Sequence, residues 1–151
     1  MVGLDGGKST GWSQSGDMTR IELATCSFRE FRPEMGQPIR ITRGHPRWRL
    51  PYRLAGKVPE LAPDATEWAM KDDPAGFAAR YQARMDYLTP EWIANTLRFQ
   101  FPDGRLVLLC FEQVWGQLLP PAEVCHRRAF AEWWESKTGD QVPELSARPL
   151  L

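Results

Sequence analysis

The sequence predicts a single small α/β domain, in which a mixed or mostly parallel sheet is flanked by helices. Residues 105–112 form an almost continuous apolar run, which is typical of a strand buried on both faces of a sheet. Residues 129–137 follow a helical pattern that ends before Gly139, and a short apolar run follows at 142–145. A strand, a helix and a second strand in this order indicate a parallel β-α-β unit.

Two short strands and two helices are predicted upstream of this unit. Residues 21–26 alternate and then become apolar, and 38–42 form a second run whose proline favours a sheet edge. The pairs at 73–74 and 89–90 each start a helix, because Asp or Thr can accept from free amides and proline tolerates the first helical position. Residues 60–70 are expected to be a connection.

Side chains at helical spacing are assigned to the core, since an aromatic stripe is more often packing than a binding site. On the two predicted helices, the residues assigned to the face that packs on the core are Phe77, Tyr81, Met85, Leu88, Ile93 and Leu97. The tryptophans assigned to packing are Trp68, Trp92, Trp133 and Trp134.

Composition limits the class of protein. The chain has 151 residues, 42% of them hydrophobic, which suits one domain with a real core. Its zero formal charge hides an asymmetry, because the part up to Lys57 is basic and the remainder is acidic. No apolar run approaches the roughly 20 residues of a membrane span, and no signal-peptide layout is present, so we expect a cytoplasmic protein without membrane contact. Three cysteines argue for reduced thiols.

Polar and thiol side chains follow the predicted strands and open the predicted helix. The carboxyl ends of parallel strands meet at one crevice, where binding sites form in sheets of this kind. If the upstream strands lie parallel to the strand at 105–112, this crevice gathers Cys26, Ser27, Arg43, Cys110, Glu112, Cys125, His126 and Arg127.

Two motifs resemble a known family. They are Leu-Leu-Cys-Phe-Glu at 108–112 and Cys-His-Arg-Arg at 125–128, with looser similarity at 36–46 and 61–63. Over roughly residues 19–146 the chain resembles the domain of unknown function 488 family. The resemblance implies a small cytoplasmic α/β domain with clustered motif residues, and it implies no established reaction.

The motif residues permit thiol chemistry. Cys125 lies near a predicted helix N-terminus beside His126 and Arg127, where a thiol pKa is lowered and an anion is held. Such a thiolate could attack an anionic substrate, with Glu112 as acid or base and Cys110 nearby. A tyrosine-phosphatase loop is excluded, because neither Cys110 nor Cys125 is followed by Arg six positions later.

Two other interpretations of the same residues stay open. Cys110, Cys125 and His126, with Cys26 or His45, are soft metal ligands, but their spacing matches no zinc signature, so no cofactor is expected. In a purely structural interpretation Cys110 is merely buried, Arg127 pairs with Glu112 and His126 hydrogen-bonds a carbonyl.

A basic segment follows the second predicted strand. No acidic residue occurs between Met35 and Pro59, and Trp48 and Tyr52 are interleaved with the basic side chains. Arginines alternating with aromatic rings can neutralise phosphates while the rings stack on bases, although a solvated face with both rings in the core is equally consistent. The basic set is Arg40, Arg43, His45, Arg47, Arg49, Arg53 and Lys57.

The first 17 residues are expected to be a flexible leader or an expression remnant. The sequence at 7–9 ends like a P-loop but lacks the required earlier glycine and strand, so that motif is rejected. Asp5 with its glycines resembles the first hairpin of RuvC-like nucleases, a remote alternative that needs further carboxylates from later strands.

Two functions of different classes remain. The first is an enzyme acting on a nucleotide, nucleic acid or other anionic substrate through the Cys, His, Arg and Glu pocket. The second is a non-catalytic module that binds nucleic acid or protein through the basic Arg40–Lys57 face. The oligomeric state is open.

Overall fold

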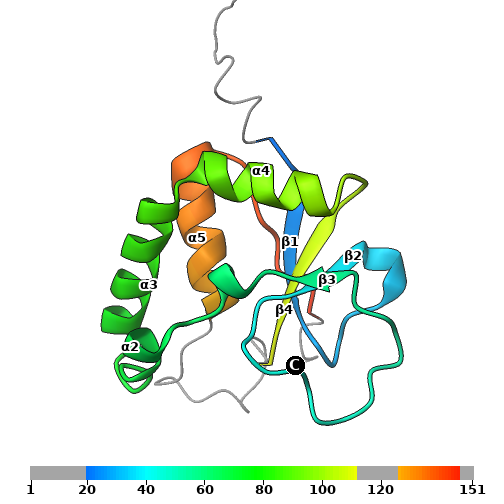
Figure 1. Ribbon diagram of the computed structural model, residues 1–151, viewed down its shortest axis with the longest axis horizontal. Coiled ribbons are helices and arrows are strands. Elements are labelled where there is room, and N and C mark those ends of the chain that lie inside the picture. Colours follow the sequence, from blue (N-terminus) through cyan, green and yellow to red (C-terminus); the bar gives the residue numbers. More distant parts are fainter. Residues whose placement is uncertain (1–19, 112–125, 147–151) are drawn as a thin grey trace, which may run out of the picture.

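The protein is a small α/β domain, described by a computed structural model for residues 20–111 and 126–146 (Figure 1). Its strands are β1 (Leu23–Ser27), β2 (Gln37–Arg40), β3 (Gly56–Lys57) and β4 (Leu106–Cys110). Its helices are α2 (Ala65–Trp68), α3 (Pro74–Leu88), α4 (Pro90–Gln100) and α5 (His126–Thr138), with 3₁₀ helices at Pro33–Met35 and Pro59–Leu61. The predicted α/β class is confirmed.

The four strands of the described residues are all parallel, in the spatial order β1-β4-β2-β3. The register pairs Ser27 with Cys110 and Arg40 with Leu109, so the carboxyl ends of β1, β4 and β2 reach the same edge. The parallel arrangement that would bring the candidate residues to one crevice is therefore present.

The predicted strand at 142–145 is wrong in extent. Only one bridge forms, in which the Thr25 amide donates to the Pro143 carbonyl at 2.9 Å and the Leu145 amide donates to the Thr25 carbonyl at 2.7 Å. Pro143 has no amide hydrogen, so a regular ladder cannot continue through it. This segment still covers the free edge of β1.

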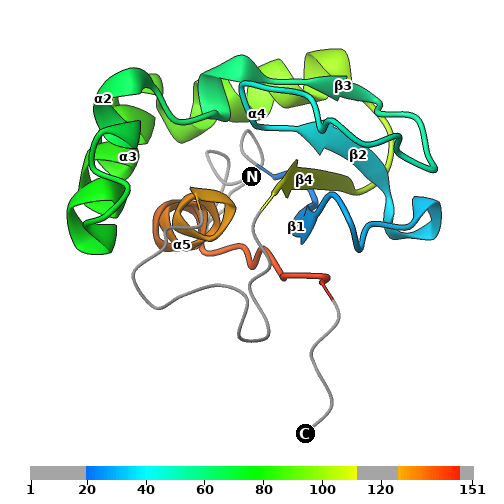
Figure 2. The ribbon, with the colours of Figure 1, turned by 90° about the horizontal axis from the view of Figure 1, so that it is seen from below.

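The two faces of the sheet are covered differently, as Figure 2 shows. One face packs on α3, α4 and α5 around the side chains of Leu23, Ile39 and Leu108. The other face carries Ala24, Cys26, Val107 and Leu109 and is covered by loop residues that include Leu50 and Tyr52. Helices therefore lie on one side of the sheet and loops on the other.

The helix starts agree with the capping signals. The Asp73 side chain accepts from the Gly76 amide, and the Thr89 hydroxyl accepts from the Trp92 amide, each ahead of a proline. A third start was missed by the prediction of a connection at 60–70. There the Asp64 side chain and Glu67 form a reciprocal capping box that opens α2.

The packing assignments are confirmed for most aromatic side chains and wrong for two. Tyr81, Trp133 and Trp134 are buried, whereas Trp92 is 40% exposed and Trp68 is 48% exposed. Trp92 lies beside the core-facing Ile93 but points off the packed face of α4, and Trp68 ends a four-residue helix at the surface. Within the described residues, no helix is long and apolar enough to cross a membrane.

Candidate functional site

The sheet has a crevice between the carboxyl ends of β4 and β2. From β2 the chain moves to β3 across the loop-covered face, whereas from β4 it moves past β1 through α5 on the helical face. The two connections thus leave in opposite directions. Ligands in open parallel sheets bind at this kind of switch point, outside the carboxyl ends of the strands.

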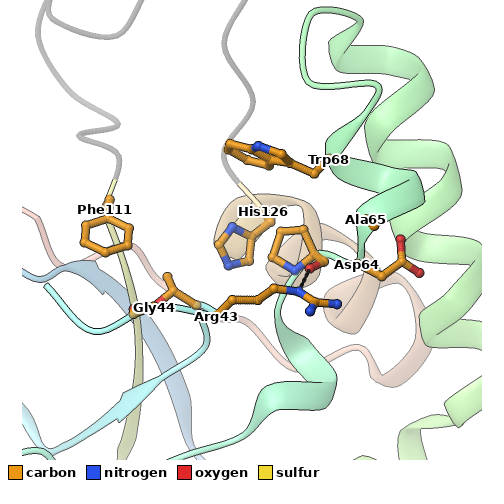
Figure 3. A pocket seen from close by; sticks show the side chains of 9 residues that line it. Arg43, Gly44, Asp64, Ala65, Trp68, Phe111 and His126 are labelled. Carbon is orange, nitrogen blue, oxygen red and sulfur yellow. Dashed lines mark hydrogen bonds between the residues drawn. The ribbon is translucent and has the colours of Figure 1, made fainter.

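A pocket of about 350 Å³ occupies this position (Figure 3). Its walls are residues 42–44 after β2, residues 63–65 and Trp68 at α2, Phe111 after β4, and His126 at the start of α5. Figure 3 shows the rings of Trp68, Phe111 and His126 around one space, with Arg43 across from Trp68. The volume falls in the range of small-molecule sites, and the aromatic walls suit a flat ligand.

Arg43 provides a positive charge on this pocket. Its Nε donates to the Pro63 carbonyl at 2.9 Å, which holds the side chain across the opening. Among the described residues, no carboxylate forms an ion pair with Arg43, and its Nη atoms have no partner. The guanidinium can therefore donate to an anionic group of a ligand.

His126 brings an ionisable ring to the same pocket. Its Nε2 lies 2.7 Å from the Ile41 carbonyl, and the side chain is only 4% exposed. A carbonyl can only accept, so Nε2 carries a proton and the basic nitrogen of the neutral ring is Nδ1. His126 is also the first residue of α5, so the positive end of that helix dipole lies at the pocket.

The wall that carries Trp68 is held from α3 by Arg84. This guanidinium donates to Glu67 Oε2 at 2.6 Å and to the carbonyls of Glu60 and Ala62 at 2.7 and 2.6 Å. Asp64, the one acidic residue among the described residues of the pocket wall, also faces Arg84, with Oδ2 3.4 Å from Nε. Its charge is thus partly balanced outside the pocket.

Arg127 lies next to His126 in sequence but belongs to a separate polar cluster. Its side chain is fully buried, and it donates to both carboxylate oxygens of Glu144, at 3.0 and 2.9 Å, and to Cys110 Sγ at 2.8 Å. Glu144 also accepts from the Thr25 hydroxyl at 2.7 Å. We call these four residues the Arg127 cluster.

Charge in the Arg127 cluster is stabilised by the ion pair. Burial alone would raise the pKa of Glu144, but the hydrogen bonds and the charge of Arg127 outweigh burial and lower that pKa. Glu144 thus stays ionised, and its bidentate contact with Arg127 is a geometry typical of a structural ion pair. The cluster holds α5 against β1, β4 and the segment after α5.

Cys26 and Cys110 are buried, and neither forms a disulfide bond. Burial raises the pKa of the Cys26 thiol, which therefore stays protonated at neutral pH. The hydroxyl of Ser146 lies 3.6 Å from Cys26 Sγ and accepts from the Ser27 amide at 3.1 Å. Neither thiol lines the pocket.

The structure brings together only part of the predicted site. Arg43 and His126 share the pocket, whereas Cys26, Ser27, Cys110 and Arg127 are buried beside it. Glu112, Cys125 and the leader with Asp5 lie outside the described residues. Of the structural alternatives, the carbonyl partner of His126 and the burial of Cys110 are present, and a bidentate carboxylate of Arg127 comes from Glu144.

The predicted basic face is exposed, apart from a half-buried Arg40. Arg40 donates to the Arg43 carbonyl at 3.4 Å, and His45 Nδ1 lies 2.9 Å from the Pro46 carbonyl. The remaining basic side chains, which form no ion pair with any described carboxylate, are Arg47, Arg49, Arg53 and Lys57. Trp48 is 37% exposed and Tyr52 half-buried, so the rings are not both in the core.

Sequence reasoning missed the α2 wall of the pocket and the carboxylate partner of Arg127. The spacing of Asp64 and Glu67 was a usable capping signal, and it would have placed Trp68 near the start of a helix. Nothing local marks Glu144, because its pairing with Arg127 depends on how the segment after α5 returns to β1. In residues 20–111 and 126–146, no group of three or more His, Cys, Asp or Glu is placed to hold a metal ion.

No family model, curated protein or solved structure matches the chain. Membership of the domain of unknown function 488 family therefore stays a prediction, as do the catalytic roles of Cys110, Glu112, Cys125, His126 and Arg127.

Proposed function

We propose that this chain binds a small anionic ligand with a flat ring, of the nucleotide class, in the pocket at the carboxyl ends of β4 and β2. The observation that carries the proposal is the pocket itself. It joins two partly exposed aromatic rings, Trp68 and Phe111, to an arginine whose Nη atoms have no partner among the described residues, at the position where parallel sheets bind ligands.

Each part of a nucleotide has a partner in this arrangement. A base can stack on the Trp68 or Phe111 ring, and a phosphate can accept from Arg43 near the positive end of α5. Asp64, the single carboxylate among the described wall residues, is partly balanced by Arg84. An anion is therefore favoured over a cation.

Catalysis on such a ligand is the enzymatic form of the proposal. His126, whose ring lines the pocket, is a described group that could move a proton. The contribution of Cys125 and Glu112 stays a prediction, since both lie outside the described residues. A cytoplasmic location is part of the proposal and is consistent with Cys26 and Cys110, neither of which forms a disulfide bond.

Calorimetric titration with adenosine and uridine monophosphates tests the pocket. We expect saturable binding. Trp68→Ala should weaken it by about tenfold, which is the scale of one lost stacking contact. Arg43→Gln should also weaken it, and the affinity of this variant should depend less on salt than that of the wild type. Trp92→Ala is the matched control, because Trp92 is similarly exposed but lies on α4, outside the pocket. Absence of saturable binding, or equal losses from Trp68→Ala and Trp92→Ala, would overturn the proposal.

A further inference from the structure

The aromatic surface of the pocket does not end at the pocket. Phe111, on its wall, contacts Trp48 edge-on, with ring centroids 6.0 Å apart and planes at 70°. Trp48 belongs to the loop that covers the other face of the sheet. The rings of Trp68, Phe111 and Trp48 are 48%, 41% and 37% exposed, so each presents a partly open face. The two surfaces that the sequence presented as alternative sites are thus joined through Phe111.

Positive charge accompanies these rings. The Arg29 guanidinium lies 4.7 Å from the centre of the Trp48 ring, Arg47 and Arg49 flank Trp48 in sequence, and Arg43 lies at the pocket. All four arginines are exposed. In the described part of the chain none of them forms an ion pair with a carboxylate. They are available to a polyanion that runs along the rings.

The nearby carboxylates are already engaged. Glu30 Oε1 accepts from the Ser27 hydroxyl at 3.2 Å, and Asp64 accepts from the Glu67 amide and faces Arg84. The stretch between Met35 and Pro59, which carries the basic face, contains no acidic residue at all. Glu30 and Asp64 keep their negative charges, but four arginines lie along the rings, so positive charge exceeds negative charge there.

Rings alternating with arginines favour a single-stranded nucleic acid over an acidic peptide. Every base has a flat face to stack on a ring, whereas a carboxylate side chain gains nothing from Trp48 or Phe111. A paired base cannot enter the pocket, because it would first have to leave its duplex. An unpaired strand satisfies both features of the surface.

We propose that the pocket takes one base of a single-stranded nucleic acid and that the neighbouring nucleotides pass over Phe111 and Trp48 along the arginines of residues 43–49. This inference rests on the proposed function, because it extends the ligand of the same pocket. It names the substrate class as an oligonucleotide instead of a free nucleotide.

The test compares a mononucleotide with labelled oligothymidylates and oligouridylates of increasing length, up to about eight nucleotides, by fluorescence anisotropy. Affinity is expected to rise by about tenfold or more from the mononucleotide to roughly four nucleotides, and to fall steeply with salt. The two series separate DNA from RNA as the source of the strand. A polyglutamate of the same charge, added as competitor, should displace the oligonucleotide poorly.

Variants separate this inference from the pocket itself. Trp48→Leu keeps an apolar side chain but removes the stacking face, and it should weaken oligonucleotide binding by about tenfold and leave mononucleotide binding unchanged. Arg47→Ala and Arg49→Ala should also weaken oligonucleotide binding and leave mononucleotide binding unchanged. The oligonucleotide affinity of these variants should depend less on salt than that of the wild type. The controls are Trp92→Ala and Arg98→Ala, which change a ring and a charge on α4, and they should leave both ligands unaffected.

Three outcomes would overturn the inference. If mononucleotides bind and longer strands bind no tighter, the pocket function stands and the extension is wrong. If length helps but Trp48→Leu has no effect, binding is electrostatic and the rings are not the path. If polyglutamate competes as well as the oligonucleotide, the partner is an acidic polypeptide. Failure of mononucleotides and oligonucleotides alike overturns both proposals.

Discussion

Two arginine sites lie near the start of α5 and differ in almost every physical respect. Arg127 is fully buried and divides its donors between one carboxylate and a thiol, whereas Arg43 is exposed and uses one donor on a carbonyl. The first site is closed by its own partners; the second has donors left for a ligand. Identity of residue type therefore says little about function until burial and pairing are known.

The largest expected effect comes from breaking the closed site. Arg127→Ala leaves Glu144 buried without its cation, and we expect a loss of about 3–5 kcal/mol in the free energy of unfolding, measured by urea denaturation. The double variant Arg127→Met with Glu144→Leu should recover much of this loss, since apolar pairs often replace buried ion pairs well. Near wild-type stability of Arg127→Ala would show that the Arg127 cluster is not structural.

A smaller effect is expected from the wall of the open site. Arg84→Ala removes the donors that hold Glu67 and the carbonyls of Glu60 and Ala62, so we expect a loss of about 2 kcal/mol in unfolding free energy. Nucleotide affinity should fall with it, because these contacts position Trp68. Arg80→Ala, an exposed arginine one helical turn earlier on α3, is the control and should change neither quantity. If stability falls while nucleotide affinity stays unchanged, the contacts of Arg84 do not position Trp68 for the ligand.

The smallest effect concerns the loop that carries the basic face. Tyr52 donates to the Phe28 carbonyl at 2.6 Å, and burial raises its pKa to about 12. A raised pKa favours the neutral folded form, so this stabilisation is complete below about pH 10, the ordinary tyrosine value, and is lost as pH rises through about 12. An ultraviolet titration of Tyr52→Phe should lack the step near that pH. If the variant instead lacks a step near the ordinary tyrosine value of about pH 10, Tyr52 does not anchor the loop.

Much of the fold was predictable because its signals are local. The buried run at β4 and the Asp-Pro and Thr-Pro starts of α3 and α4 each act within a few residues, and the structure confirms all of them. The two-residue β3 was missed, since Gly56 and Lys57 form a strand only by pairing with Ile39 and Arg40.

The site was predictable in position but not in detail. The carboxyl ends of parallel strands and the start of the following helix meet at one edge of a sheet, so Arg43 and His126 were expected near each other, and both line the pocket. The depth of each side chain was not predictable. Consecutive helical positions point about 100° apart, so His126 reaches the pocket wall while Arg127 enters the interior.

Gly36 shows which positions in a related sequence would report the fold and which would report the ligand. Its φ is 143°, and a Cβ at this position would meet the Arg105 carbonyl oxygen. A glycine at the corresponding place in another sequence would thus report only that β2 enters the sheet in the same way. Substitutions at Trp68 or Phe111 carry no such backbone penalty, so variation there would trace changes of ligand on an unchanged scaffold.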